Sequence, residues 1–305
     1  MTSVIVDPGF TDDQRRERLY AGDIVVHTGS PALRALVDFT RGLVEAAFDP
    51  LDPETAQYEM EVESYAGVLA RLKPEFIHHP ESKRHLRAVL EEHGCDPELT
   101  YFDVPRLRTS TSDDYLTTGI AYAFHPHRDT WYSAPMMQVN WWLPVYDVHP
   151  DNVVAFHPEY FDQPVRNGSG SYNYYEWNRD SRALAASQIG VDTREQPKPE
   201  EPIALDPQIR PVPPVGGMMV FSGAQLHSSV PNTSGRTRVS VDFRTVHRAD
   251  VESGRGALNV DSHCTGTTMR DYLRVADMER LPAEVVAPYD EGVPEELLQY
   301  AIYSS

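Results

Sequence analysis

The sequence predicts a mainly β fold, a sandwich or jelly roll, with helices at both ends of the chain. After residue 100, short stretches rich in β-branched and aromatic residues are separated by Gly, Pro, Asn and Asp, which is typical of strands joined by turns. Before residue 100 and after residue 250, apolar residues recur at helical spacing instead. With 305 residues, 40% of them apolar, the chain has enough material for one large core.

Helices are expected through most of residues 1–100. Segment 31–48 spaces its Leu, Val and Phe residues to suit one helical face. A second helix is expected over 52–72, because it opens with Asp-Pro, a capping residue followed by proline at the first helical position. A third is expected over 81–94, where Gly94 supplies the usual left-handed cap.

The expected β core covers residues 101–248. Its strands are predicted in five segments: 116–130, 135–148, 152–158, 216–223 and 237–247. A polar insertion rich in Tyr and Pro, 162–215, interrupts this core and carries one expected helix near 181–190. So long an insertion in a compact domain is usually a functional lid or binding loop.

Residues 249–305 form the expected C-terminal helical flank, with helices predicted over 267–277 and 294–303. The sequence shows no internal repeat and no low-complexity tract. We therefore expect a single domain over 1–305, in which two helical flanks enclose one β core.

Charge and cysteine content exclude several classes of function. The net charge is −19, so we expect no nucleic-acid partner and no binding to an anionic membrane. The sequence has no apolar run long enough to span a membrane and no basic-then-apolar start typical of a secretory signal. Its two cysteines, Cys95 and Cys264, lie far apart and suit a reducing compartment, so a cytoplasmic location is expected. The acidity serves solubility, and it would also favour a cationic substrate.

His127 and Asp129 form an H-x-D pair between two expected strands. On an extended segment these two side chains point the same way and can hold one ion together. A second histidine, His227, follows a Gly-Gly strand pattern. Two His and one carboxylate form a facial triad that leaves positions on Fe(II) open for a chelating cosubstrate and O₂. Zinc prefers a closed tetrahedral site or a His-rich open one, so the set favours iron.

Arg238 follows His227 by eleven residues. If residues 231–235 form a hairpin turn, the strand after it returns antiparallel to 218–221, with Arg238, Ser240 and Asp242 on one face. Arg offers a planar fork that matches a carboxylate. A solvent-facing arginine in a surface ion pair is the alternative, and the register with the triad favours the carboxylate anchor. Arg106 and Arg108, on a further expected strand, could assist at the same anion site.

These motifs resemble the phytanoyl-CoA dioxygenase-like branch of the Fe(II)/2-oxoglutarate-dependent oxygenases. They are H-x-D at 127–129, G-x₄-F-x₅-H at 216–227 and N-x-S-x₃-R at 232–238, and the resemblance covers roughly 105–247. It implies a double-stranded β-helix, a cupin-like jelly-roll barrel, with iron near one mouth. It also implies a cosubstrate site for 2-oxoglutarate, whose candidate residues are Arg238, Ser240, Ser229, Trp142, Gln138 and Asn140.

The resemblance implies oxidation of a small molecule, coupled to conversion of 2-oxoglutarate and O₂ into succinate and CO₂. Halogenases of this superfamily replace the carboxylate ligand with a small residue, so Asp129 favours hydroxylation or a related oxidation. A polar or cationic substrate of secondary metabolism is expected. Trp131 and Tyr132 follow the H-x-D motif, and His157 stands where the family commonly has a P-G-S-H segment; these three are candidate substrate contacts.

Two alternatives stay open at this point. The chain could be a jelly-roll binding protein that has lost catalysis, although such barrels are free to lose the triad and Arg238. It could also be a cupin-like hydrolase or isomerase with another metal, which would not need Arg238 at its place.

Overall fold

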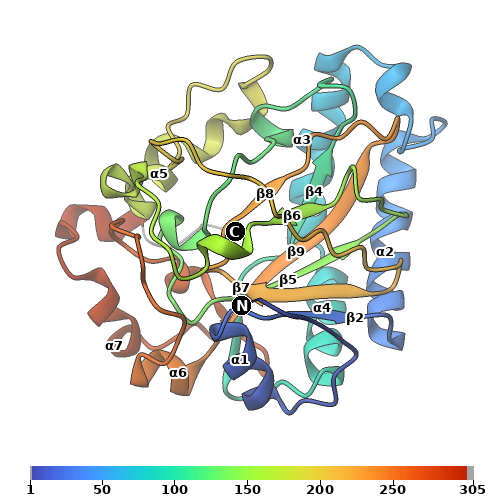
Figure 1. Ribbon diagram of the computed structural model, residues 1–305. Coiled ribbons are helices and arrows are strands. Elements are labelled where there is room, and N and C mark those ends of the chain that lie inside the picture. The colour runs from blue at the N-terminus through green and yellow to red at the C-terminus, as the bar shows by residue number, and fades with distance from the viewer. Residues whose placement is uncertain (1, 301–305) are drawn as a thin grey trace.

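The computed structural model describes residues 2–300 and combines a large sheet with helices on either side (Figure 1). The eight-stranded sheet has the order β1-β2-β7-β5-β9-β3-β10, with β4 also paired to β9, and β6 and β8 form a second sheet of two strands. The strands of the large sheet are β1 (Val4–Val6), β2 (Ile24–His27), β3 (Thr100–Phe102), β4 (Arg106–Ser110), β5 (Val139–Pro144), β7 (Met218–Ser222), β9 (Arg238–His247) and β10 (Leu273–Arg274). The small sheet consists of β6 (Val154–Phe156) and β8 (His227–Ser229).

Three N-terminal helices cover one face of the large sheet, at the right of Figure 1. Helix α2 (Pro31–Phe48) begins at Ser30, whose side chain accepts from the Leu33 amide, and buries the apolar stripe that predicted it. Helix α4 (Pro80–Glu92) ends in two bonds of the Schellman type, with Gly94 at φ +76°. Both helices confirm their predictions. The main core lies between these helices and the sheet, and a smaller apolar cluster separates the large sheet from the small one.

The helix expected over 52–72 was placed wrongly. Residues after Asp52 form a turn, because its side chain and carbonyl accept from nearby amides. A short 3₁₀ turn at Ala56–Tyr58 follows, and α3 runs over Val62–His78. It therefore continues through Pro74, which lies on the exposed side of the helix. The missing proline N–H leaves a carbonyl there that water can satisfy.

The expectation of a mainly helical N-terminus missed β1 and β2. Strand β2 is only four residues long, and its apolar run has no periodicity that separates strand from buried helix. Its hydrogen bonds come from β7, which lies about 190 residues further on, with Val25 opposite Val220. Strand β1 then adds parallel to β2 at the edge of the sheet.

Four of the five predicted strand segments contain a strand, and 116–130 does not. That segment holds two 3₁₀ turns, η2 (Gly119–Ala121) and η3 (Asp129–Tyr132), and a single bridge from His127 to His227. Gly119 adopts φ +59°, which breaks the extended path. The prediction of a strand over 116–130 was wrong, although the bridge still holds the H-x-D motif in place.

The expected hairpin between 216–223 and 237–247 was also wrong. Strand β9 pairs with β5, β3 and β4, while β7 pairs with β5 and β2. The turn at 231–235 instead carries the chain from β8 in the small sheet to β9 in the large one. The Asn232 side chain secures it by donating to the carbonyls of Ser110 and Arg236. The alternation along β9 was predicted correctly, since Val239, Val241 and Phe243 face the main core.

The last part of the chain is less helical than expected. Residues 267–277 form a 3₁₀ turn (Thr268–Asp271) and β10, which pairs with β3. The helix near 181–190 is a 3₁₀ helix at Arg182–Ser187, after α5 (Tyr174–Asp180). The helix expected over 294–303 is 3₁₀ at Glu295–Tyr300. Residues 301–303 of that prediction lie outside the residues that the structure describes. The remaining helices are α1 (Asp12–Tyr20), α6 (Arg248–Ser253) and α7 (Ala283–Val286).

Across residues 2–300, no helix has both the length and the apolar character needed to cross a membrane.

Candidate metal centre

A cavity of about 390 Å³ opens between the polar face of the large sheet, the small sheet and the insertion. Strands β4, β5 and β9 provide its floor, and β8 contributes His227 to Ser229. Segment 162–215 supplies one wall, which includes Tyr172, Tyr174 and Trp177. The insertion therefore shapes the cavity, as the sequence suggested.

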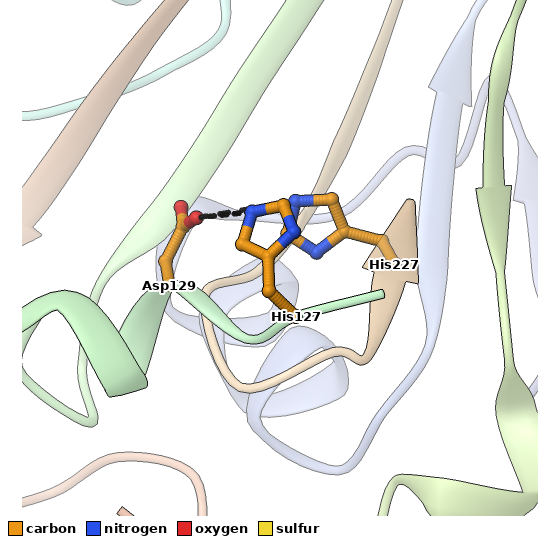
Figure 2. Close-up of side chains that lie close together, drawn as sticks. All are labelled: His127, Asp129 and His227. Carbon is orange, nitrogen blue, oxygen red and sulfur yellow. Dashed lines mark ion pairs between the residues drawn. The ribbon is translucent and has the colours of Figure 1, made fainter. Parts of the chain in front are cut away.

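Three of the predicted site residues meet at this cavity. His127, Asp129 and His227 each offer a ligand atom, and these atoms lie within 4.8 Å of one another. Asp129 Oδ1 is 3.6 Å from Nε2 of His127 and 3.9 Å from Nε2 of His227. Figure 2 shows the two imidazoles side by side, with the carboxylate directed at their edge. The antiparallel bridge between the two histidines, with both N–H···O distances at 2.9 Å, sets this arrangement.

Each imidazole is oriented by a backbone carbonyl. Nδ1 of His127 lies 2.9 Å from the carbonyl oxygen of His125, and Nδ1 of His227 lies 2.9 Å from that of Gln225. A carbonyl can only accept, so each Nδ1 carries the proton and each Nε2 keeps a free lone pair. Burial and the neighbouring His127 lower the pKa of His227 to about 4. His227 is therefore neutral at pH 7, as a metal ligand must be.

The carboxylate of Asp129 is held at its other oxygen. Oδ2 accepts from Nε2 of Gln138 at 3.0 Å and from Nδ2 of Asn140 at 2.6 Å. Burial alone would raise the pKa of Asp129, but the neighbouring His127 and the charge of Arg244 hold it well below its usual range. Oδ1 thus stays charged and free to face an ion. Gln138 and Asn140 were expected beside the cosubstrate. They do line the cavity, but their side-chain amides bind the carboxylate of Asp129.

The donor set fits a divalent transition metal. Two donor atoms that each lie about 2.1 Å from one ion can be up to about 4.2 Å apart, and the two measured separations are below that limit. Two imidazoles and one carboxylate that occupy adjacent positions match the facial arrangement typical of non-haem Fe(II). The cavity on the other side leaves room for further ligands.

Arg238 lies in the same cavity with part of its guanidinium unpaired. Its Nη1 donates to the carbonyl of Asn152 at 2.9 Å, and its Cζ lies 5.6 Å from the ring centroid of Trp142. Its Nε is buried and has no hydrogen-bond partner among residues 2–300. Burial lowers the pKa of Arg238 to about 10, so the side chain stays charged at neutral pH. A buried charged donor without a partner is costly, so an anion in the cavity would be a favourable ligand for Arg238.

The two candidate serines differ in their contacts. Ser240 follows Arg238 on the same face of β9, and its hydroxyl is buried and unpartnered among residues 2–300. Ser229 lines the cavity, and its hydroxyl accepts from the Phe124 amide at 3.1 Å. Ser240 therefore has an unused donor but lies outside the residues that line the cavity, while Ser229 lines the cavity and accepts one bond.

Of the three residues expected to contact the substrate, only one lines the cavity. Tyr132 lines the cavity, with its ring 5.4 Å from that of His127. Trp131 is fully buried outside the lining, and its Nε1 donates to Asp261 at 2.7 Å. His157 also lies outside the lining, with Nε2 3.0 Å from the Ser228 hydroxyl. Trp131 and His157 thus pack the surrounding structure rather than face the cavity.

Sequence reasoning missed five charged residues of the cavity, which are Lys73, Asp103, Arg182, Arg194 and Arg244. Arg244 lies 3.9 Å from Asp129 and 3.2 Å from Asp242. The polar face of β9 that carries Arg238 and Asp242 continues to Arg244 two residues later, so the sequence pattern could have indicated it. Lys73 reaches the cavity from α3, where its Nζ donates to the carbonyl of Ile120. No local pattern links Lys73 to the triad, because only the packing of α3 on the sheet brings it there.

The bond from Asn140 to Asp129 yields a first test. Asn140→Leu removes one of the two amides that hold Oδ2 and leaves the three ligands unchanged. Loss of such an orienting contact typically lowers metal affinity about 10–100-fold. We expect that loss in a competition titration with a metal chelator. Asn259→Leu, an exposed asparagine outside the cavity, is the control, and unchanged metal affinity in Asn140→Leu would contradict the assignment.

Gly119 allows the insertion to close over the cavity. A Cβ at this position would lie 2.4 Å from the backbone oxygens of both Ala185 and Gln188. Gly119→Ala is expected to cost about 1–3 kcal/mol for this overlap, in addition to about 1 kcal/mol for its positive φ. A lower melting temperature and faster proteolysis within 162–215 are the measurements. Gly190→Ala is the control, since Gly190 has φ +77° and open space around it; equal losses in both variants would contradict the overlap.

Comparison with known proteins gives structural neighbours only. No protein-family profile matches the chain, and no curated protein sequence does. The structure is similar to EvdO2 from Micromonospora carbonacea var. aurantiaca complexed with 2-oxoglutarate, with a TM-score of 0.46 and 12% identity over 78% of this chain and 92% of that one. It is also similar to the non-haem α-ketoglutarate-dependent epimerase SnoN from nogalamycin biosynthesis, with a TM-score of 0.39 and 13% identity over 87% and 100%.

A third neighbour is the non-haem monooxygenase ThoJ, with a TM-score of 0.36 and 11% identity over 71% of this chain and 70% of that one. Of these neighbours, EvdO2 was solved with 2-oxoglutarate, SnoN is a non-haem α-ketoglutarate-dependent epimerase and ThoJ is a non-haem monooxygenase. The chemistry of this chain is argued below from its own residues.

Proposed function

We propose that this protein is a non-haem Fe(II)- and 2-oxoglutarate-dependent oxygenase of small molecules, with His127, Asp129 and His227 as the iron ligands. One observation carries the proposal: a converging His₂-Asp set and the buried, partly unpaired Arg238 share one cavity. A metal site alone suits many reactions. The planar, charged guanidinium of Arg238 beside the metal site suits a cosubstrate that chelates iron at one end and has a carboxylate at the other.

The residues of the chain have separate roles in this proposal. Bound Fe(II) and 2-oxoglutarate supply O₂ activation coupled to decarboxylation of the cosubstrate to succinate and CO₂. Arg238 holds the distal carboxylate, and Trp142 limits its position from beneath the guanidinium. The amides of Gln138 and Asn140 direct Oδ1 of Asp129 at the iron. The rings of Phe124 and Tyr132 pack around His127 and exclude water from the metal.

Hydroxylation is the outcome we propose, because the carboxylate of Asp129 occupies the position that a halide would need. The two sheets enclose an apolar cluster between them, which supports a jelly-roll core within a single domain. Cys95 and Cys264 are both free thiols, which supports action in the cytoplasm. A binding protein or a hydrolase would leave the cost of the unpaired Arg238 without a purpose.

The test is spectroscopic. Anaerobic addition of Fe(II) and 2-oxoglutarate to the pure protein should produce the weak visible charge-transfer band of the chelate. Succinate in place of 2-oxoglutarate is the control, because it lacks the keto acid and should give no band. If iron-loaded protein with saturating 2-oxoglutarate shows no band, the proposed function fails.

A further inference from the structure

The side chains that line the cavity have a positive net charge, whereas the chain as a whole is negative. The whole protein carries −19, yet seven cationic side chains line the cavity against three carboxylates. The cations are Lys73, Arg106, Arg108, Arg182, Arg194, Arg238 and Arg244, and the carboxylates are Asp103, Asp129 and Asp242. Arg194 and Arg182 have further acidic neighbours just outside the lining, Asp192 at 2.6 Å and Asp271 at 4.0 Å. Five cations and three carboxylates then remain, an excess of two positive charges.

The proposed cofactors do not remove this excess. A divalent iron and a 2-oxoglutarate dianion cancel each other, so the loaded site still carries two positive charges when Lys73 is protonated. Low-dielectric walls make such an imbalance unfavourable unless an anion enters. The expectation of a cationic substrate came from the net charge of the chain, and the local charge of the cavity favours the opposite sign.

The pairing within the cavity shows where the excess lies. Asp103 contacts Arg106 and Arg244, and Asp242 contacts Arg108 at 2.8 Å as well as Arg244. These arginines therefore share two carboxylates. Lys73 and Arg238 have no carboxylate within 4.0 Å among residues 2–300. Since Arg238 is assigned to 2-oxoglutarate, Lys73 is the cation left for another ligand.

Lys73 is placed to meet such a ligand. Its Nζ donates to one backbone carbonyl, that of Ile120, and an ammonium has three N–H donors. Burial and the nearby positive charge of Arg108 lower the pKa of Lys73 to about 7. A bound anion would offset both effects and restore the full charge of the lysine.

A line of side chains connects this position to the metal ligands. Arg108 lies with its Cζ 5.6 Å from the ring centroid of Phe124, and that ring stacks on His127 at 4.9 Å. The wall beside it is aromatic, with Tyr122, Tyr132, Tyr172, Tyr174 and Trp177 in the lining. A molecule whose acidic end lies at Lys73 and Arg108 would therefore extend its body along aromatic rings toward the iron.

We propose that Lys73 and Arg108 form a second anion site in the cavity, which binds the carboxylate or phosphate of an acidic substrate with a ring-containing or apolar body. The inference rests on the proposed function for the identity of the reaction. Lys73 determines specificity in it, and the triad and Arg238 keep their separate roles.

The experiment compares charged and neutral probes of one shape. Isothermal titration calorimetry is run anaerobically on the Fe(II)-loaded full chain with saturating 2-oxoglutarate, so that Arg238 is occupied. Benzoate and phenyl phosphate are titrated against benzamide. We expect at least one acidic probe to bind about tenfold tighter than benzamide, about the effect of one charge-assisted hydrogen bond. The stronger of the two acids shows whether the site prefers carboxylate or phosphate.

Variants assign the effect to Lys73. Lys73→Met is expected to remove the tenfold preference, and Lys73→Arg to keep it. Lys83→Met, on α4 and outside the cavity, should leave it unchanged. Equal binding of acids and benzamide, or an unchanged preference in Lys73→Met, would overturn the inference. Absence of the chelate band would instead count against the oxygenase proposal, and the same titration on the metal-free protein would still test the anion site.

Discussion

Asp129→Asn is expected to abolish iron binding while leaving the fold intact. The amide is isosteric with the carboxylate, and its oxygen can still accept from Gln138 and Asn140. Its nitrogen would then face the metal position with no lone pair to donate. Loss of a ligand exceeds the about 10–100-fold cost of losing an orienting contact, so we expect no retained iron after gel filtration, no chelate band and no turnover.

The measurement is iron content by atomic emission beside the melting temperature of the metal-free protein. Asp147→Asn is the matched control, because it removes the same charge from an exposed position outside the cavity. It should keep the wild-type iron content. If Asp129→Asn binds iron as the wild type does, the triad is not the metal site.

The parts of the fold that were predicted correctly have strong local signals. Helices α2 and α4 have long amphipathic stripes and caps, and β9 alternates polar and apolar residues over 238–244. The misses have weak or long-range causes. Strand β2 depends on β7 for its hydrogen bonds, and 116–130 has strand composition but turns at Gly119. The composition of a segment indicates only a preference for a strand, and whether the strand forms depends on the neighbouring strand that pairs with it.

The site was predictable to the extent that its residues lie on short motifs. His127 and Asp129 are two residues apart, and His227 and Arg238 flank one turn, so motif spacing brought them together even though the hairpin argument behind Arg238 was wrong. The second set of contacts was harder. Gln138 and Asn140 were placed on the right strand face but given another partner, and Lys73 lies on a helix with no motif. Such contacts depend on how distant elements pack, which no single sequence segment encodes.

Arg238→Met is expected to weaken 2-oxoglutarate binding by at least about 30-fold. Truncation of one partner in a buried, hydrogen-bonded charge pair costs about 2–5 kcal/mol. Iron affinity without cosubstrate should change little, because Arg238 is not among the metal-ligand group. Arg238→Lys should give an intermediate loss, since it keeps the charge and loses the planar fork. Titration of the chelate band with 2-oxoglutarate measures all three proteins, and Arg236→Met, an exposed arginine two residues earlier, is the control.

The same variant separates a functional role of Arg238 from a structural one. In the free protein, the guanidinium is buried with Nε unpaired, a state that costs free energy. Methionine of similar length removes that cost and gives up one bond to the Asn152 carbonyl. We therefore expect the melting temperature of cosubstrate-free Arg238→Met to equal or exceed that of the wild type, while 2-oxoglutarate stabilises only the wild type. A destabilised variant with unchanged cosubstrate affinity would mean that Arg238 supports the fold and that 2-oxoglutarate, if it binds, is held elsewhere.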